Sequence, residues 1–141
     1  MEAKEMFDVV ICVGPKDEGL IKKQLKYTKP NIVGYRNIYL ISKSGNLQIK
    51  DTVDICEEKF PFSLKSEELF GRFGDRKGWY FQQLLKLYAG SVIPGILGNY
   101  LVIDADTFFL KPTRFFDGRI PLYNYGTENH EPYFHHMKKL K

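Results

Sequence analysis

The chain has 141 residues, and its 43% hydrophobic and 15% aromatic content is enough for the core of one globular domain. Its 21 Lys and Arg against 17 Asp and Glu suit an anionic small molecule but do not make a nucleic-acid-binding surface. Residues 1–6 lack the apolar core of a signal peptide, and no segment has the roughly 20 apolar residues of a membrane span. We therefore expect a soluble, cytoplasmic protein in which Cys12 and Cys56 are buried free thiols.

The first half of the chain alternates between strand-like and helix-like patterns. Residues 7–13 form an almost continuous apolar, β-branched run, typical of a strand covered on both faces. A short amphipathic helix is predicted over residues 17–27, closed by Pro30, and strands are predicted over 37–41 and 52–56. Strand, helix and strand at this spacing predict an α/β fold with a parallel sheet and helices packed on it.

The middle of the chain is predicted to contain one long helix and another strand. A short helix over residues 65–70 and a loop over 71–78 come before a helix over 79–89. A more polar side of that helix holds, at i, i+3, i+4 and i+7, Trp79, Gln82, Gln83 and Lys86. An apolar strand over residues 100–103 follows, and we expect it to be mainly buried, like the strands before it.

The last part of the chain is predicted to hold two short strands and a helix. The strands cover residues 108–110 and 120–125, and the helix covers residues 131–140. The three histidines of the chain are His130, His135 and His136. We interpret each as a surface or packing residue, with a third metal ligand as the alternative.

Asp104 and Asp106 follow the strand over residues 100–103 and are separated by a single residue. In an extended chain, residues two apart project to the same side, so the two carboxylates would repel each other by roughly 3 kcal/mol at ~6 Å. A hard divalent cation bound through oxygen turns this repulsion into attraction. The pair therefore predicts a metal site, and the competing interpretation is a simple turn after a strand.

Other residues are predicted to share a crevice with this pair. Ligands of open α/β sheets collect at the carboxyl ends of the strands, which is where Val13-Gly14-Pro15-Lys16 also lies. Arg72, Arg76 and Lys77 come just before the helix over residues 79–89, whose N-terminus itself favours an anion. Carboxylates for a cation, with basic residues and a helix end for phosphate, predict a metal-bridged diphosphate; ordinary surface charge is the alternative for the basic residues.

Two spaced motifs resemble those of a known family. Residues 78–87 fit the pattern G-W-x-x-Q-Q-x-x-K-L, and residues 100–107 fit Y-L-x-x-D-x-D-T, with Lys111-Pro112 close behind. Both patterns are similar to those of a bacterial and viral glycosyltransferase-like family whose members resemble the GT-A glycosyltransferases. The resemblance extends from the first strand to about Phe116, and two motifs in this order are far more specific than D-x-D alone.

The resemblance implies a Rossmann-like GT-A nucleotide-sugar-binding fold over residues 1–141, with a mainly parallel sheet flanked by helices. Because 35 residues follow Asp106, the acceptor lobe is expected to be abbreviated or missing, and no catalytic residue is implied. Mn²⁺ or Mg²⁺, held by Asp106 and by Asp104, would bind the diphosphate of a UDP- or GDP-sugar donor, whereas the acceptor stays unidentified. Contact with the ribose is the alternative role for Asp104. The resemblance and the basic residues before the helix together give these expected donor-binding residues: Val13, Gly14, Pro15, Lys16, Arg72, Arg76, Lys77, Gln83, Lys86, Asp104, Ala105 and Asp106.

Several alternatives stay open at this point. Trp79 is interpreted as a core anchor rather than a sugar platform, and Gln82 and Lys86 fit a solvated helix face equally well. A carbohydrate- or nucleotide-sugar-binding module without turnover would use the same residues. A haloacid-dehalogenase-like phosphotransferase would use the first Asp of D-x-D as its nucleophile. That motif normally ends the first strand and has Thr or Val two positions beyond its second Asp, where this chain has Phe108.

Overall fold

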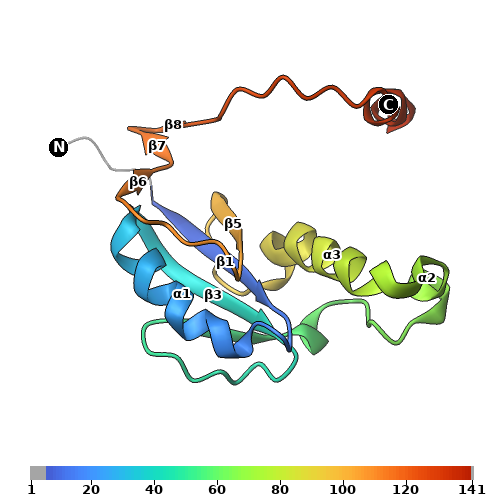
Figure 1. Cartoon of the computed structure of the whole chain (residues 1–141), viewed down its shortest axis with the longest axis horizontal. Coiled ribbons are helices and arrows are strands. Elements are labelled where there is room, and N and C mark those ends of the chain that lie inside the picture. Colours follow the sequence, from blue (N-terminus) through green and yellow to red (C-terminus); the bar gives the residue numbers. More distant parts are fainter. Residues whose placement is uncertain (1–5, 141) are drawn as a thin grey trace.

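The computed structural model describes residues 6–140, which form an α/β fold around a four-stranded parallel sheet (Figure 1). The strands are β1 (Phe7–Val13), β3 (Tyr35–Ser42), β4 (Val53–Cys56) and β5 (Tyr100–Asp104). Their order across the sheet is β4-β3-β1-β5, and all three neighbouring pairs are parallel. The sequence prediction of a parallel α/β sheet is confirmed, and the arrangement is compatible with a Rossmann-like fold.

Two helices cover opposite faces of this sheet. Side chains alternate along β1, so each helix packs against every second residue of that strand. One face packs against α1 (Glu18–Asn31), and its core joins Val9 and Ile11 to Ile21 and Leu25. The other face packs against α3 (Lys77–Val92), and its core joins Val10 and Cys12 to Phe81, Leu85 and Ala89. All seven residues of β1 are buried, as expected for a strand covered on both sides.

Helix α1 differs from its prediction at Pro30, which lies inside the helix instead of closing it. A proline in the last turn removes a single hydrogen bond, and the helix end is anchored in other ways. The backbone N–H of Ile32 donates to the carbonyl of Thr28, and the side chain of Asn31 donates to the carbonyl of Phe109 at 2.5 Å. These contacts explain why the helix continues to Asn31.

Helix α3 is longer at both ends than the predicted span of residues 79–89. Short helical turns precede it, namely η1 (Glu57–Lys59), α2 (Glu67–Phe70) and η2 (Gly71–Arg76), so most of the loop predicted over residues 71–78 is helical. Gly90 is part of the helix and lies against β5, where a Cβ would meet the ring of Tyr100 at 2.9 Å. The glycine therefore allows close packing instead of ending the helix.

Strand β5 is less buried than predicted. Ile103 is buried, but the other apolar residues, Tyr100, Leu101 and Val102, are only half-buried. The reason is its place in the sheet, where it pairs with β1 on one side and lies at the edge on the other. The strand still carries Asp104 at its carboxyl end, so the predicted position of the D-x-D pair holds.

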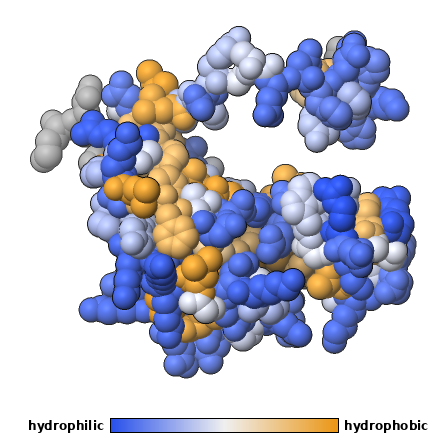
Figure 2. Space-filling model, in the orientation of Figure 1, coloured by the Kyte–Doolittle hydropathy of each residue, from blue (hydrophilic) through white to orange (hydrophobic). Residues whose placement is uncertain are grey.

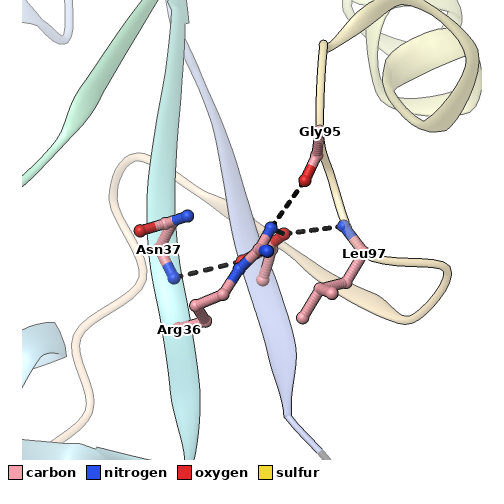
Figure 3. A network of polar contacts seen from close by, with 5 residues as sticks. Arg36, Asn37, Gly95 and Leu97 are labelled. Atoms are coloured by element: carbon pink, nitrogen blue, oxygen red, sulfur yellow. Dashed lines mark hydrogen bonds and ion pairs between the residues drawn. The ribbon is translucent and has the colours of Figure 1, made fainter.

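A buried carboxylate ties the loop before β5 to the rest of the sheet (Figure 3). Asp8 is 0% exposed and accepts hydrogen bonds from Arg36 Nε at 3.1 Å and Nη2 at 2.7 Å. The backbone N–H groups of Asn37 and Leu97 donate to it at 3.1 and 2.8 Å, and Arg36 also donates to the carbonyl of Gly95 at 2.7 Å. The hydrogen bond to Asp8 raises the pKa of Arg36, which keeps the guanidinium charged.

The segment after Asp106 contains only short strands. β6 (Thr113–Arg114) pairs with β2 (Ile32–Val33), and β7 (Phe116–Asp117) pairs with β8 (Ile120–Pro121). The prediction of a strand over residues 108–110 is wrong, and the carbonyl of Phe109 accepts a hydrogen bond from the side chain of Asn31 in α1 instead of pairing with a strand. The strand predicted over residues 120–125 is reduced to β8, where Pro121 lacks the N–H needed to continue a ladder.

The remaining described residues form an exposed arm. The helix predicted over residues 131–140 is confirmed as α4 (Glu131–Met137) followed by η3 (Lys138–Leu140). Every residue from 117 to 140 is exposed, and the segment after β8 lies apart from the sheet and its helices (Figures 1 and 2). Within residues 6–140, no helix combines the length and apolar character required to cross a membrane.

Both cysteines are free, as expected, although they differ in burial. Cys12 is buried at the carboxyl end of β1, and burial raises the pKa of its thiol to about 12. Cys56 is only partly buried at the end of β4, where its Sγ lies 3.3 Å from the carbonyl oxygen of Lys43. The expectation of two buried thiols is therefore correct for Cys12 alone.

Candidate functional site

The order in which strands are added to the sheet reverses beside β1, and a hollow lies at that point. In chain order β3 and β4 extend the sheet on one side of β1, whereas β5 returns to its other side. Such a switch point leaves a crevice at the carboxyl ends of the strands. Here Cys12 of β1 stands opposite Asp104 of β5, and both line a hollow of about 220 Å³.

The D-x-D pair forms one wall of this small hollow. The N–H of Thr107 donates to the carbonyl of Asp104 at 3.1 Å, which closes a turn that presents Asp106. All three residues line the hollow; the two aspartates are exposed, and Ala105 between them is also buried in the core beneath α1. The predicted turn and the predicted shared crevice are thus two features of one loop.

Helix α3 forms the opposite wall. The four residues of its predicted polar side, Trp79, Gln82, Gln83 and Lys86, all line the small hollow. The helical period separates this side from Phe81, Leu85 and Ala89, which are buried in the core. Trp79 is 51% exposed, so its interpretation as a core anchor is wrong, because the other face of the helix already fills the core.

Lys86 connects the two walls. Its Nζ donates to Oδ1 of Asp104 at 2.6 Å, and the side chain of Lys86 is 17% exposed against 63% for that of Asp104. Asp106 has no side-chain hydrogen bond or ion pair with any described residue. Of the two carboxylates, one therefore has a cationic partner within the protein and the other is free to accept a ligand.

A second and larger hollow, of about 1200 Å³, adjoins the first. It is lined by the predicted residues Val13, Gly14, Pro15 and Lys16, and it shares Cys12, Asp17, Trp79 and Gln82 with the small hollow. Aromatic and apolar side chains including Phe60, Pro61, Phe62 and Phe81 line it as well. Glu57 also lies there, and burial, partly offset by the charge of Lys43, raises the pKa of its carboxyl group.

Only one of the three predicted basic residues reaches a hollow. Lys77 lines the larger hollow as the first residue of α3, where the N-terminus of a 16-residue helix adds partial positive charge. The guanidinium of Arg72 lies 5.0 Å from the ring centre of Phe73, and that of Arg76 lies 5.1 Å from the ring centre of Trp79. Cation–π contacts therefore occupy Arg72 and Arg76 outside both hollows.

Asp17 and Gln82 line both hollows but were not predicted as donor-binding residues. Asp17 is the N-cap of α1, yet its side chain makes no capping hydrogen bond. A Cβ at Gly14 would lie 3.3 Å from Oδ2 of Asp17 and 3.4 Å from Nε2 of Gln82, so glycine leaves room between strand and helix. The available sequence signals were the position of Asp17 just after Gly14-Pro15-Lys16 and that of Gln82 on the polar side of its helix.

Helix α1 holds the backbone that follows Asp106. Gln24 is 0% exposed, and its Nε2 donates to the carbonyl of Thr107 at 2.8 Å. One turn along, the ring of Tyr27 packs edge-on against Phe108, with ring centres 5.4 Å apart, and Asn31 binds the carbonyl of Phe109. A single helix thus fixes three successive residues immediately after the D-x-D pair.

The residues of the small hollow suit a hard divalent cation. Asp104 and Asp106 offer carboxylate oxygens, which Mn²⁺ and Mg²⁺ prefer, and Asp17 lines the same hollow. Residues 6–140 bring together no cluster of three or more His, Cys, Asp and Glu side chains placed to bind one ion. The histidines do not help, because all three are exposed on the arm. A cation would therefore complete its ligand shell with oxygens of a bound substrate or of water, as Mg²⁺ commonly does.

Comparison with known proteins places the chain in a family without assigning an activity. No curated protein and no solved structure matches it significantly. A family model described as "Family of unknown function (DUF6492)" matches residues 5–140. That match includes both walls of the small hollow, the larger hollow and the exposed arm. The chain therefore belongs to the DUF6492 family.

Proposed function

We propose that this protein is a metal-dependent glycosyltransferase of GT-A-like fold that uses a nucleotide sugar as donor. The observation that carries the proposal is the position of the D-x-D turn. Asp104 and Asp106 lie at the switch point of the sheet and face the polar side of α3 across one hollow. Carboxylates, a lysine, two glutamines and an exposed tryptophan around one hollow are suited to a charged, hydroxyl-rich ligand.

The two adjoining hollows fit the two ends of such a donor. The small hollow, about 220 Å³, is polar and matches a diphosphate with its metal and part of a sugar. The larger hollow, about 1200 Å³, has aromatic and apolar walls that suit a nucleoside. Asp17, Trp79 and Gln82 line both, so a ligand that extends from one hollow to the other stays in contact with the protein.

The residues divide the work according to charge. Asp104 and Asp106 would hold the divalent cation, which would supply Lewis-acid stabilisation of the departing nucleoside diphosphate. Lys77 and the N-terminus of α3 add positive charge at the larger hollow, which favours an anionic donor over a neutral one. Gln82 and Gln83 offer amide donors and acceptors to sugar hydroxyls. The exposed ring of Trp79 offers a flat apolar surface on which the sugar ring can pack.

The order of strands argues against a haloacid-dehalogenase-like phosphotransferase. That class places its nucleophilic Asp at the end of the first strand, which here is β1 and ends at Val13. Asp104 instead ends β5, an edge strand that comes after β1, β3 and β4. Its Oδ1 is also held by Lys86, which lowers the nucleophilicity of that oxygen.

Calorimetric titration with UDP and GDP, in Mn²⁺ and then in excess chelator, tests the proposal. Binding is expected with Mn²⁺ and should weaken at least about tenfold in Asp106→Asn, because the amide keeps the shape but removes an anionic ligand. The matched control is Asp75→Asn, an exposed aspartate outside both hollows, which should bind like the wild type.

Two results would overturn the proposal. One is the absence of binding by either nucleotide, and the other is binding that ignores both chelator and the Asp106→Asn substitution. If nucleotide sugars bind but are neither hydrolysed nor transferred to glycan acceptors, the protein is a binding module without turnover. Formation of a phosphoaspartate with a phosphate donor would point to phosphotransfer instead.

A further inference from the structure

Lys86 contacts the carboxylate oxygen of Asp104 that a metal ion would need as its ligand. Its ammonium lies 2.6 Å from Oδ1 of Asp104, and the side chain is largely covered by its surroundings. Lys86 belongs to the polar side of α3, so the helix that lines the hollow also delivers this cation to it. Lys86 thus neutralises Asp104, whereas Asp106 has no cationic partner among the described residues.

A divalent cation and the Lys86 ammonium compete for the same carboxylate. The two are positive charges, so the approach of Mn²⁺ or Mg²⁺ to Asp104 is opposed as long as Lys86 stays in contact. A lysine side chain has a flexible four-carbon stem, so its ammonium can turn to another anion nearby. The diphosphate of a donor bound on the cation is such an anion, because both would lie in the hollow that Lys86 lines.

We propose that Lys86 is the resident counter-cation of Asp104 and is exchanged during ligand binding. A divalent cation displaces it from the carboxylate, and its ammonium passes to the diphosphate of the incoming nucleotide. The second half of this exchange rests on the proposed function. The exchange makes the free cation bind weakly and makes cation and nucleotide bind better together than separately.

The test measures two affinities in Lys86→Met and in the wild type. Binding of Mn²⁺ alone, followed by electron paramagnetic resonance of the free ion, should tighten roughly tenfold in the variant, because the competing charge is gone. Binding of UDP or GDP in saturating Mn²⁺ should weaken, because the phosphate loses a cationic partner. Lys86→Arg keeps the charge and should stay close to the wild type with Mn²⁺ alone.

Lys22→Met is the matched control, because this lysine is exposed on α1 and lines neither hollow. Lys86→Gln repeats the measurement with a polar side chain in case the methionine variant does not fold. Unchanged or weaker Mn²⁺ binding in the neutral variants, or no Mn²⁺ binding by any protein, overturns the counter-cation role. Tighter Mn²⁺ binding without any nucleotide binding supports the counter-cation role but overturns the proposed function. Nucleotide binding with unaltered Mn²⁺ affinity supports the proposed function but overturns the counter-cation role.

Discussion

The carboxylates at the two ends of the sheet contrast in their surroundings. Asp8, near the start of β1, is 0% exposed and accepts hydrogen bonds from a guanidinium and two backbone N–H groups. Asp104 and Asp106, at the carboxyl end of β5, are exposed, and only Asp104 has a cationic partner, Lys86. The same chemical group is thus fully occupied at one end of the sheet and largely available at the other.

This difference separates a structural carboxylate from a ligand-binding one. A carboxylate has about four acceptor positions, and at Asp8 protein donors use them, which leaves none for a ligand. Burial without such partners would destabilise the fold, so the network around Asp8 is required for that residue to be there at all. The D-x-D pair is exposed at a switch point, where unused acceptor positions cost little and can bind a cation.

The largest expected effect follows from Asp8→Asn. The amide cannot accept the same set of hydrogen bonds and removes the negative charge opposite Arg36, so the free energy of unfolding should fall by about 3 kcal/mol. Urea denaturation measures this loss, with Asp106→Asn as the comparison at the other end of the sheet. A loss below about 1 kcal/mol for Asp8→Asn, or an equal loss for Asp106→Asn, would contradict the distinction drawn between the two ends.

A smaller effect is expected when the support of the D-x-D turn is removed. Gln24→Met deletes the hydrogen bond to the carbonyl of Thr107 but also a buried side-chain oxygen that has no partner, so stability should change by less than about 1 kcal/mol. Metal-dependent affinity for UDP or GDP should nevertheless fall about tenfold, as for other residues that position metal ligands.

The control for Gln24 is a double substitution. In the Asp106→Asn background, Gln24→Met should have little further effect on nucleotide affinity, because the metal-binding carboxylate that Gln24 positions is already absent. Calorimetry of the four proteins gives the coupling directly. Additive effects of the two substitutions would show that Gln24 acts on the fold in general and not on the position of Asp106.

The smallest effect concerns Cys12, which lies four residues after Asp8 on the same strand, at the carboxyl end of β1 and opposite Asp104. Its pKa rises from 9.0 to about 12, chiefly because burial disfavours the thiolate. The stability that the buried, protonated Cys12 thiol contributes is complete below about pH 9. It is lost as the pH rises toward about 12, because the thiol ionises first in the unfolded chain. At about pH 10 the loss should be roughly 1 kcal/mol.

Denaturation of the wild type and of Cys12→Ala at about pH 8 and pH 10 isolates this contribution. The alanine variant should be less stable at both values but should lose less stability between them. Equal losses of stability between the two pH values in the two proteins would mean that the Cys12 thiol contacts water. The buried region around Asp8 would then not extend along β1 as far as the small hollow.

Local patterns in the sequence were sufficient for the central elements. The apolar run of β1 and the turn of Asp104 to Thr107 depend on neighbouring residues, so their positions followed from composition and spacing. The polar side of α3 followed from the helical period, and it became one wall of the small hollow. Trp79 was assigned to the core because of its large apolar ring, although the same period had placed it on the polar side, and it is exposed.

Contacts between distant segments decided the rest. Pro30 stays inside α1 and residues 108–110 form no strand because Asn31 and Gln24 bind backbone about 80 residues away, and no local pattern reports such pairs. The same holds for Asp17 and Lys86, which meet the D-x-D pair only once β1, α3 and β5 are packed. The sequence by itself determined which residues could carry the chemistry, since side-chain chemistry and periodicity are local properties. The tertiary structure decided which of them share a hollow and which are neutralised by a neighbour, since those are properties of packing across the sheet.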